Sequence, residues 1–161
     1  MSRTSTPKNL KFDQLLEKLI AIYPNIKFSS ANSFSWNYNK KCVSYNKNSE
    51  FAVADLLHEI GHAQCDHEGY TSDLSLLSKE IEAWSIAEDI GKRLNISIPK
   101  NYIDKCINSY RNWVYKRSLC PKCLQNGIEK FEREYVCTNC YERWQVSSAQ
   151  ESRVYKKSLT K

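Results

Sequence analysis

The sequence predicts an α+β fold, in which helices and a short antiparallel sheet form one domain and a small cysteine-bounded module follows. Three observations support this class. Apolar residues recur at helical spacing, short aromatic and β-branched runs occupy residues 26–45, and two Cys-x-x-Cys pairs lie within residues 118–146. We therefore expect a main domain at 1–117, a module at 118–146, and a flexible basic tail at 147–161.

The first helix is predicted at residues 8–22, where apolar side chains recur every three or four positions. Pro24 ends it, because the residue before a proline disfavours helical backbone. The residues that follow change character and predict one or two β-hairpins. The segments that carry this prediction are Ile26–Phe28, Phe34–Tyr38 and Cys42–Tyr45.

A central, buried helix is predicted from Glu50 to about Cys65, because apolar side chains occur on nearly every side of it. Asn48 or Ser49 can cap its first turn. A polar loop then leads to two further helices, at about 73–94 and 100–116, and Pro99 stands at the start of the second one.

Composition limits the class of protein. The chain has 161 residues, seven cysteines and a formal net charge of +6. Its apolar runs are too short to cross a bilayer, and residues 1–14 lack the apolar core of a signal peptide. We therefore expect a cytoplasmic protein that does not enter a membrane, with cysteines that are thiols or metal ligands rather than disulfides. Residues 101–161 carry 12 basic and 6 acidic side chains, so all of the net charge lies there.

The predicted central helix carries the strongest chemical motif, His58-Glu59-Ile60-Gly61-His62. Residues four apart share a helix face, so both imidazoles can bind one zinc ion. Glu59 then stands beside a zinc-bound water, from which it can take a proton as the oxygen attacks a carbonyl. The motif predicts a catalytic zinc with His58 and His62 as ligands and Glu59 as general base. The alternative is a chance match of two structural histidines.

A catalytic zinc needs a third protein ligand. His67 would lie about 140° from the ligand face on a continuing helix, which favours a helix-end or loop residue without a metal role. Cys65 could face the metal, although a small buried thiol is its default interpretation. Glu80 shares the apolar face of its predicted helix, where a buried carboxylate needs a strong partner, whereas Glu82 can be solvated. We therefore expect Glu80 to be the third ligand.

These residues resemble those of a known enzyme group. The run HEIGHAQCDH followed by EIEAWSIA is similar to the motifs of ImmA/IrrE-type zinc metallopeptidases and, more broadly, of small gluzincins, over residues 10–95. The resemblance implies a gluzincin-like metallopeptidase fold, and it maps the family's ligand glutamate onto Glu80. It also implies a protein substrate, such as a regulatory DNA-binding protein that undergoes limited proteolysis.

The resemblance further implies that the strand before the active helix pairs with an extended substrate, and Cys42–Tyr45 is that strand here. Relatives carry Asp or Asn directly after the alanine of the second motif, as a partner of a ligand histidine, whereas this chain carries Trp84. Another group must fill that role, or the activity is lower. The motifs assign no oxyanion stabiliser. Tyr70 is a candidate, and a loop or core tyrosine is its alternative interpretation.

A second metal site is predicted in the C-terminal module. Two Cys-x-x-Cys pairs at this spacing match a structural zinc with four thiolate ligands, which are Cys120, Cys123, Cys137 and Cys140. Residues 124–136 between the pairs predict a β-hairpin. The module resembles a zinc ribbon, and because its core is so small we expect it to need the metal for folding. The other cysteines are expected to be buried thiols: Cys42, Cys65 and Cys106.

The basic excess of this module favours nucleic acid as a partner. Cations bind phosphates, and exposed aromatic faces stack on bases, in the recognition of single strands. The cations are Lys116, Arg117, Lys122, Lys130, Arg133 and Arg143, and they are interleaved with Tyr115, Phe131, Tyr135, Tyr141 and Trp144. The alternative is a solvated basic surface over a small aromatic core.

The motifs support three functional hypotheses. The first is a zinc metallopeptidase whose ribbon directs it to a partner or to nucleic acid. The second is an SprT-like protease, which also joins an HExxH domain to a C-terminal zinc ribbon and acts on DNA-bound proteins. Its third ligand is usually a later histidine, and none follows His67 here. The third is a non-enzymatic zinc protein that binds nucleic acid or a partner, in which Cys65 would close the first site as a fourth ligand.

Overall fold

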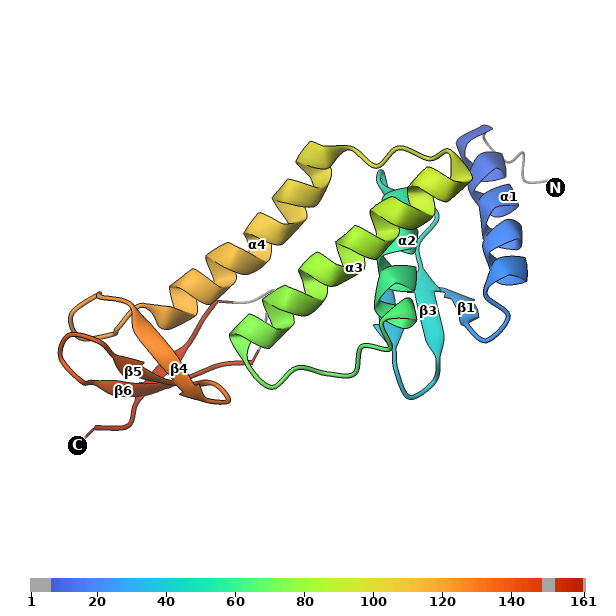
Figure 1. Cartoon of the computed structure of the whole chain (residues 1–161). Coiled ribbons are helices and arrows are strands. Elements are labelled where there is room, and N and C mark those ends of the chain that lie inside the picture. The colour runs from blue at the N-terminus through green and yellow to red at the C-terminus, as the bar shows by residue number, and fades with distance from the viewer. Residues whose placement is uncertain (1–6, 149–152, 161) are drawn as a thin grey trace. The chain divides into compact units, whose positions relative to one another are not determined.

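The computed structural model describes residues 7–148 and 153–160, with side chains from residue 11 onward, and the described elements confirm the α+β class (Figure 1). The helices are α1 (Pro7–Ile22), α2 (Ala52–Gln64), α3 (Asp73–Leu94) and α4 (Lys100–Ser118). The strands are β1 (Lys27–Ser30), β2 (Ser35–Asn37), β3 (Cys42–Tyr45), β4 (Gly127–Phe131), β5 (Glu134–Cys137), β6 (Arg143–Val146) and β7 (Lys156–Ser158). Within the described part, no helix combines the length and the apolar character that a membrane span requires.

The described residues divide into two compact units. The first comprises the chain up to Glu68 together with Ile81–Ile98, and so holds α1, β1–β3, α2 and most of α3. The second comprises Gly69–Glu80 and the chain from Pro99 onward, and so holds the first turns of α3, α4 and β4–β7. The predicted boundary at 117–118 therefore does not separate the two units, because α4 belongs with the cysteine module.

The three-stranded sheet of the first unit has the order β1-β3-β2 and is mixed rather than antiparallel as predicted. β2 and β3 form the expected antiparallel hairpin, with Trp36 opposite Val43. β1 does not pair with β2; it runs parallel to β3 on the other side, with Phe28 opposite Val43. The chain reverses both before and after β2, so β1 and β3 point the same way. β3 is central, and its Val43 is fully buried.

The helices of the first unit follow their apolar patterns. α1 buries Phe12, Leu16 and Leu19, which lie on one face, and Phe12 contacts the ring of Tyr45 at a centroid distance of 5.7 Å. α2 buries residues on most of its sides, as predicted: Ala52, Ala54, Leu56, Leu57, His58, Ile60 and Gly61. Its first turn lacks a side-chain cap, because Phe51 rather than Asn48 or Ser49 occupies the N-cap position.

The backbones of α2 and α3 approach each other closely at Gly61. A Cβ atom at Gly61 would lie 2.2 Å from the backbone oxygen of Ala83, so only glycine allows this separation of the two backbones. The α3 residues at this contact, Ala83, Trp84 and Ala87, are all buried. At this point the distance between the two helices is therefore set by contact of their backbones rather than by interleaved side chains.

The second unit contains a four-stranded antiparallel sheet of order β4-β5-β6-β7. Its first hairpin, β4–β5, is the one predicted between the cysteine pairs. β7 is a correction to the predicted flexible tail at 147–161, since Lys156–Ser158 pairs with Trp144–Val146 of β6. The polar sequence Lys-Lys-Ser gives no strand signal, because an edge strand needs only backbone partners; residues 149–152 and 161 lie outside the described residues.

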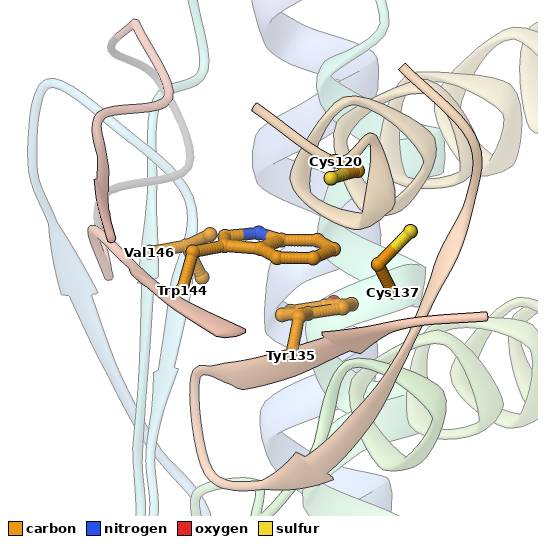
Figure 2. Close-up of a cluster of buried hydrophobic side chains, with 5 residues drawn as sticks. All are labelled: Cys120, Tyr135, Cys137, Trp144 and Val146. Carbon is orange, nitrogen blue, oxygen red and sulfur yellow. The ribbon is translucent and has the colours of Figure 1, made fainter. Parts of the chain in front are cut away.

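A small aromatic core packs against one face of the four-stranded sheet (Figure 2). The rings of Tyr135 and Trp144 stack with centroids 5.5 Å apart and an interplanar angle of 14°. The indole Nε1 of Trp144 donates to the backbone oxygen of Arg117 at 3.0 Å. This bond connects β6 to the last turn of α4, which is one reason why α4 belongs to this unit.

A buried ion pair ties the start of α3 to the same unit. Nε of Arg117 donates to Oδ2 of Asp73 at 2.7 Å, and the two side chains are 1% and 4% exposed. The hydroxyl of Tyr135 also donates to Asp73, and burial together with this carboxylate raises the pKa of Tyr135 well above its usual value. Arg117 further donates to the backbone oxygen of Ser147 and lies over the ring of Trp113.

Removing one member of this pair leaves a buried charge unpaired, so we expect Arg117→Ala to lower the free energy of unfolding by about 3–5 kcal/mol. Urea denaturation of the purified protein measures this change. Arg111→Ala is the matched control, since Arg111 is an exposed arginine on the same helix. Equal stability of the two variants would show that the ion pair does not support the unit.

Candidate metal centres

The structure brings together the three residues predicted to hold the first metal ion. One side-chain donor atom each of His58, His62 and Glu80 lies within 4.8 Å of the others. The Nε2 atoms of the two histidines are 3.1 Å apart. Two nitrogens that share one tetrahedral zinc at about 2.0–2.1 Å stand about 3.3 Å apart. The spacing of the donors therefore fits one zinc-sized ion.

The helices position these donors. His58 and His62 lie one turn apart on α2, and their rings meet edge-on with centroids 4.6 Å apart. Glu80 lies one turn before Ala83 and Trp84 on the same unbroken helix, α3. The predicted division of α3 into an apolar and a solvated face is confirmed, since Glu80 is 5% exposed and the Glu82 side chain is 61% exposed.

Trp84 holds the first histidine by stacking. Its ring lies 4.2 Å from that of His58 at an interplanar angle of 24°. Trp84 is 3% exposed and His58 is 8% exposed, so the two rings form part of the core. This flat aromatic contact thus fixes the plane of the His58 ring.

The donor set suits zinc. Two imidazoles and one carboxylate are ligands of a catalytic zinc site, in which a fourth position stays open to water or substrate. Burial of Glu80 costs free energy unless a cation or donors compensate its charge, and a metal ion is such a cation. Glu59 follows His58 directly on α2 and is half-buried. Tyr70 lies in the loop before α3 and is partly buried.

The structure assigns contacts to His67 that the sequence interpretation missed. His67 follows the end of α2, as expected, but its side chain is only 8% exposed. Its Nδ1 lies 2.8 Å from Nδ1 of His62, and its Nε2 lies 3.1 Å from Oε2 of Glu82. Cys65, His67 and Glu82 form a separate group of potential ligands within 4.8 Å. Cys65 therefore does not join His58, His62 and Glu80.

The four cysteines of the module also converge. Their sulfur atoms lie within 4.8 Å of one another, with Cys120 Sγ 3.7 Å from Cys140 Sγ and Cys123 Sγ 3.4 Å from Cys137 Sγ. Four thiolates around one zinc at about 2.3 Å stand about 3.8 Å apart. The cluster therefore fits a tetrahedral metal ion, and Figure 2 shows Cys120 and Cys137 next to the aromatic core.

Backbone hydrogen bonds lower the pKa of Cys123 and Cys137 and so favour their thiolate form, whereas burial and the neighbouring thiols raise the pKa of Cys140 to about 12. The amide of Lys122 points at Cys120 Sγ, and the amide of Asn139 points at Cys137 Sγ, each at 3.4 Å. A backbone hydrogen bond from Gln125 is the main cause that lowers the pKa of Cys123 to about 6. The other cysteines, Cys42, Cys65 and Cys106, are only partly buried rather than buried as expected.

The predicted nucleic-acid surface changes in the structure. Arg117, Tyr135 and Trp144 are buried and cannot contact a strand, because they form the ion pair and the aromatic core described above. Arg143 is paired with Glu134. Arg143 is nevertheless exposed, and Arg133 is partly buried. The other predicted cations, Lys116, Lys122 and Lys130, are exposed, and so are the rings of Tyr115, Phe131 and Tyr141. Lys122 and Tyr141 line one open depression with Pro121.

The implied role of β3 as the substrate-pairing strand is wrong. Both edges of β3 are occupied, by β1 on one side and β2 on the other. A further strand cannot add to a ladder whose backbone groups are already paired. Among the described strands of this sheet, β1 and β2 are the edges. The indole Nε1 of Trp36, on β2, donates to the backbone oxygen of His67 at 2.9 Å and so links this edge to the end of α2.

Comparisons of this chain with protein-family models, with curated proteins and with solved structures gave no match.

The two donor sets predict a metal content of two zinc ions per chain. Elemental analysis of the purified protein by mass spectrometry measures it. Replacement of Cys120 and Cys123 by serine should remove one equivalent, and replacement of His58 and His62 by alanine should remove the other. A content of one zinc in the unaltered chain would contradict one of the two sites.

The backbone contact at Gly61 predicts that Gly61→Ala damages the first centre. The added methyl group forces α2 and α3 apart, which we expect to cost about 1–3 kcal/mol of stability and to weaken zinc binding at His58 and His62. Thermal unfolding and chelator competition measure the two effects. Gly69→Ala is the control, because a Cβ atom there meets no atom within 4 Å. Equal behaviour of both variants would refute the constraint.

Proposed function

We propose that the protein is a zinc-dependent metallopeptidase of the gluzincin type that cleaves a protein substrate. The observation that supports this most is the convergence of His58 and His62 on α2 with the buried Glu80 on α3. Three protein donors leave one position of a tetrahedral ion for chemistry. Glu59 stands next to His58 on the same helix, where the proposed reaction requires a base.

Each side chain has a role in this proposal. His58, His62 and Glu80 hold the metal ion. Bound there, zinc supplies the Lewis acidity that lowers the pKa of water and polarises a carbonyl. Glu59 takes the proton of the attacking water and passes it to the amine that leaves as the peptide bond breaks. Trp84 keeps the ring of His58 in its plane by the stacking contact.

The edge of β2 is the proposed binding strand for the substrate. An extended peptide can add to an exposed sheet edge by main-chain hydrogen bonds. β2 is such an edge, and the Trp36 side chain joins it to the backbone of His67, beside the proposed metal ligands. A peptide on this strand would run near the donors of α2.

The zinc ribbon is proposed to direct the enzyme to its substrate. The exposed cations Lys116, Lys122 and Lys130 and the exposed rings of Phe131 and Tyr141 suit contacts with phosphates and bases. Nucleic acid is therefore the partner class we favour, with a DNA-associated or regulatory protein as the substrate. The proposed site of action is the cytoplasm.

Two alternatives make different demands on the first site. A non-enzymatic zinc protein would close the site with a fourth ligand, and the candidate, Cys65, groups instead with His67 and Glu82. An SprT-like protease would use a later histidine as third ligand, and the sequence has none after His67. Glu80 therefore supports the gluzincin proposal over both.

The proposal predicts that Glu59→Gln retains both zinc ions but loses peptide cleavage by roughly 10²–10⁴-fold, because the amide cannot accept the proton. Incubation with a proteome-derived peptide library, followed by mass spectrometry of new termini, measures cleavage. Glu50→Gln is the control, as an exposed glutamate just before the same helix. Cleavage by Glu59→Gln at the rate of the unaltered protein would refute the proposed role, and no cleavage by the zinc-loaded unaltered chain would favour the non-enzymatic alternative.

A further inference from the structure

A chain of polar contacts leads from His62 to the surface. Nδ1 of His62 lies 2.8 Å from Nδ1 of His67, and Nε2 of His67 lies 3.1 Å from Oε2 of Glu82. The Nε2 atom of His62 points the other way, to Nε2 of His58 at 3.1 Å. His62 thus presents one nitrogen to the proposed metal and the other to His67.

The end of α2 creates this geometry. Asp66 adopts a left-handed conformation with φ of 53°, and the amides of Asp66 and His67 donate to the backbone oxygens of Ala63 and His62 at 3.2 and 3.0 Å. These are the two bonds of a Schellman motif, in which the second residue after the C-cap folds back onto the third-last residue of the helix. That pair is His67 and His62 here, so the imidazoles meet because the helix stops.

A zinc ion bound to His62 would fix the proton positions along this series of contacts. A neutral imidazole carries a single N–H, so a His62 that gives the lone pair of Nε2 to zinc carries its proton on Nδ1. Nδ1 of His67 must then accept that proton in a hydrogen bond, which puts the proton of His67 on Nε2. This Nε2–H donates to Oε2 of Glu82. The two distances and the two proton positions are mutually consistent.

Glu82 is well placed to anchor this series of polar contacts. It lies on α3, two residues after Glu80 and on the opposite, solvated face of that helix. Cys65 is a second donor to it, and burial together with the charge and hydrogen bond of Glu82 raises the pKa of the Cys65 thiol, which keeps it protonated. A carboxylate that accepts from His67 and Cys65 holds the His67 ring in one orientation.

We infer that His67 and Glu82 are positioning residues for the first metal centre, which fix the tautomer and ring orientation of His62 and strengthen its Nε2 as a donor. This inference rests on the proposed zinc site. A carboxylate or carbonyl that accepts from the far nitrogen of a ligand histidine has this effect in zinc proteins, and here a second imidazole extends the connection to the carboxylate.

The same atoms do not form a second metal site while zinc is on His62. A cation bound by Cys65, His67 and Glu82 would need a lone pair of His67. If it took the Nε2 lone pair, the proton of His67 would move to Nδ1 and face the proton of His62 at 2.8 Å. If it took the Nδ1 lone pair, the proton of His62 would lose its acceptor.

Four variants test the inference through zinc affinity. Titration of the zinc-loaded chain with a colorimetric chelator separates the two sites, and the four-cysteine site is the internal reference. We expect His67→Ala to weaken the first site about 10–100-fold, since it removes the acceptor. His67→Asn should lose less, because its Oδ1 can replace Nδ1 as acceptor. Glu82→Ala should weaken the site measurably, and Glu88→Ala, on the same helix, should not.

A nitrogen-15 NMR spectrum of the zinc-loaded chain tests the tautomers directly. We expect a proton on Nδ1 of His62 and on Nε2 of His67, and faster solvent exchange of the His62 proton in His67→Ala. Any of three results would overturn the inference. The first is a proton on Nδ1 of His67, and the second is a zinc affinity of His67→Ala within twofold of that of the unaltered chain. The third is a third zinc equivalent in the unaltered chain that Cys65→Ser loses. Zinc retained at the first site by His58→Ala would instead overturn the proposed metal centre itself.

Discussion

The contact between the backbones of α2 and α3 at Gly61 is the constraint on which the first centre depends. Because the backbone oxygen of Ala83 occupies the space that a Cβ atom at Gly61 would need, the two helices lie closer than larger residues allow. This approach brings Trp84 onto the ring of His58 and Glu80, one turn earlier, to the two histidines. A metal ligand set from two helices requires such a fixed separation, since small displacements of the donors change the coordination geometry.

The end of α2 contributes as much to the centre as its middle. A helix that continued past Gln64 would carry His67 away from the ligand face, whereas the left-handed Asp66 turns the chain back so that His67 meets His62. Asp66 also pairs with Lys41, next to β3. The turn that ends the helix therefore also places His67 against the proposed ligand His62. The Lys41–Asp66 ion pair joins the sheet to the same end of the helix.

The second unit has only a small apolar core to stabilise its fold. Its core consists of stacked Tyr135 and Trp144 with the cysteines beside them. The buried pair of Asp73 and Arg117 adds polar connections between α3, α4 and the sheet. Because Arg117, Tyr135 and Trp144 are buried in this core and ion pair, the proposed partner must be recognised by the lysines and aromatic rings that remain exposed. A basic, aromatic composition therefore serves both the core and the surface.

The sequence by itself determined the features that depend on local spacing. The helical periods predicted α1 to α4, the four-residue spacing of His58 and His62 put both on one face of α2, the apolar face of α3 selected Glu80, and the paired cysteines predicted their cluster. Features that depend on distant backbone partners needed the tertiary structure. The parallel pairing of β1 with β3, the central position of β3, the polar edge strand β7 and the burial of Arg117 have no local signal, because each is decided by residues far along the chain. The contact of His67 with His62 lies between the two cases. The two residues are only five apart in the sequence, but their side chains meet only because the helix ends between them. The turn at Asp66 fixes that end.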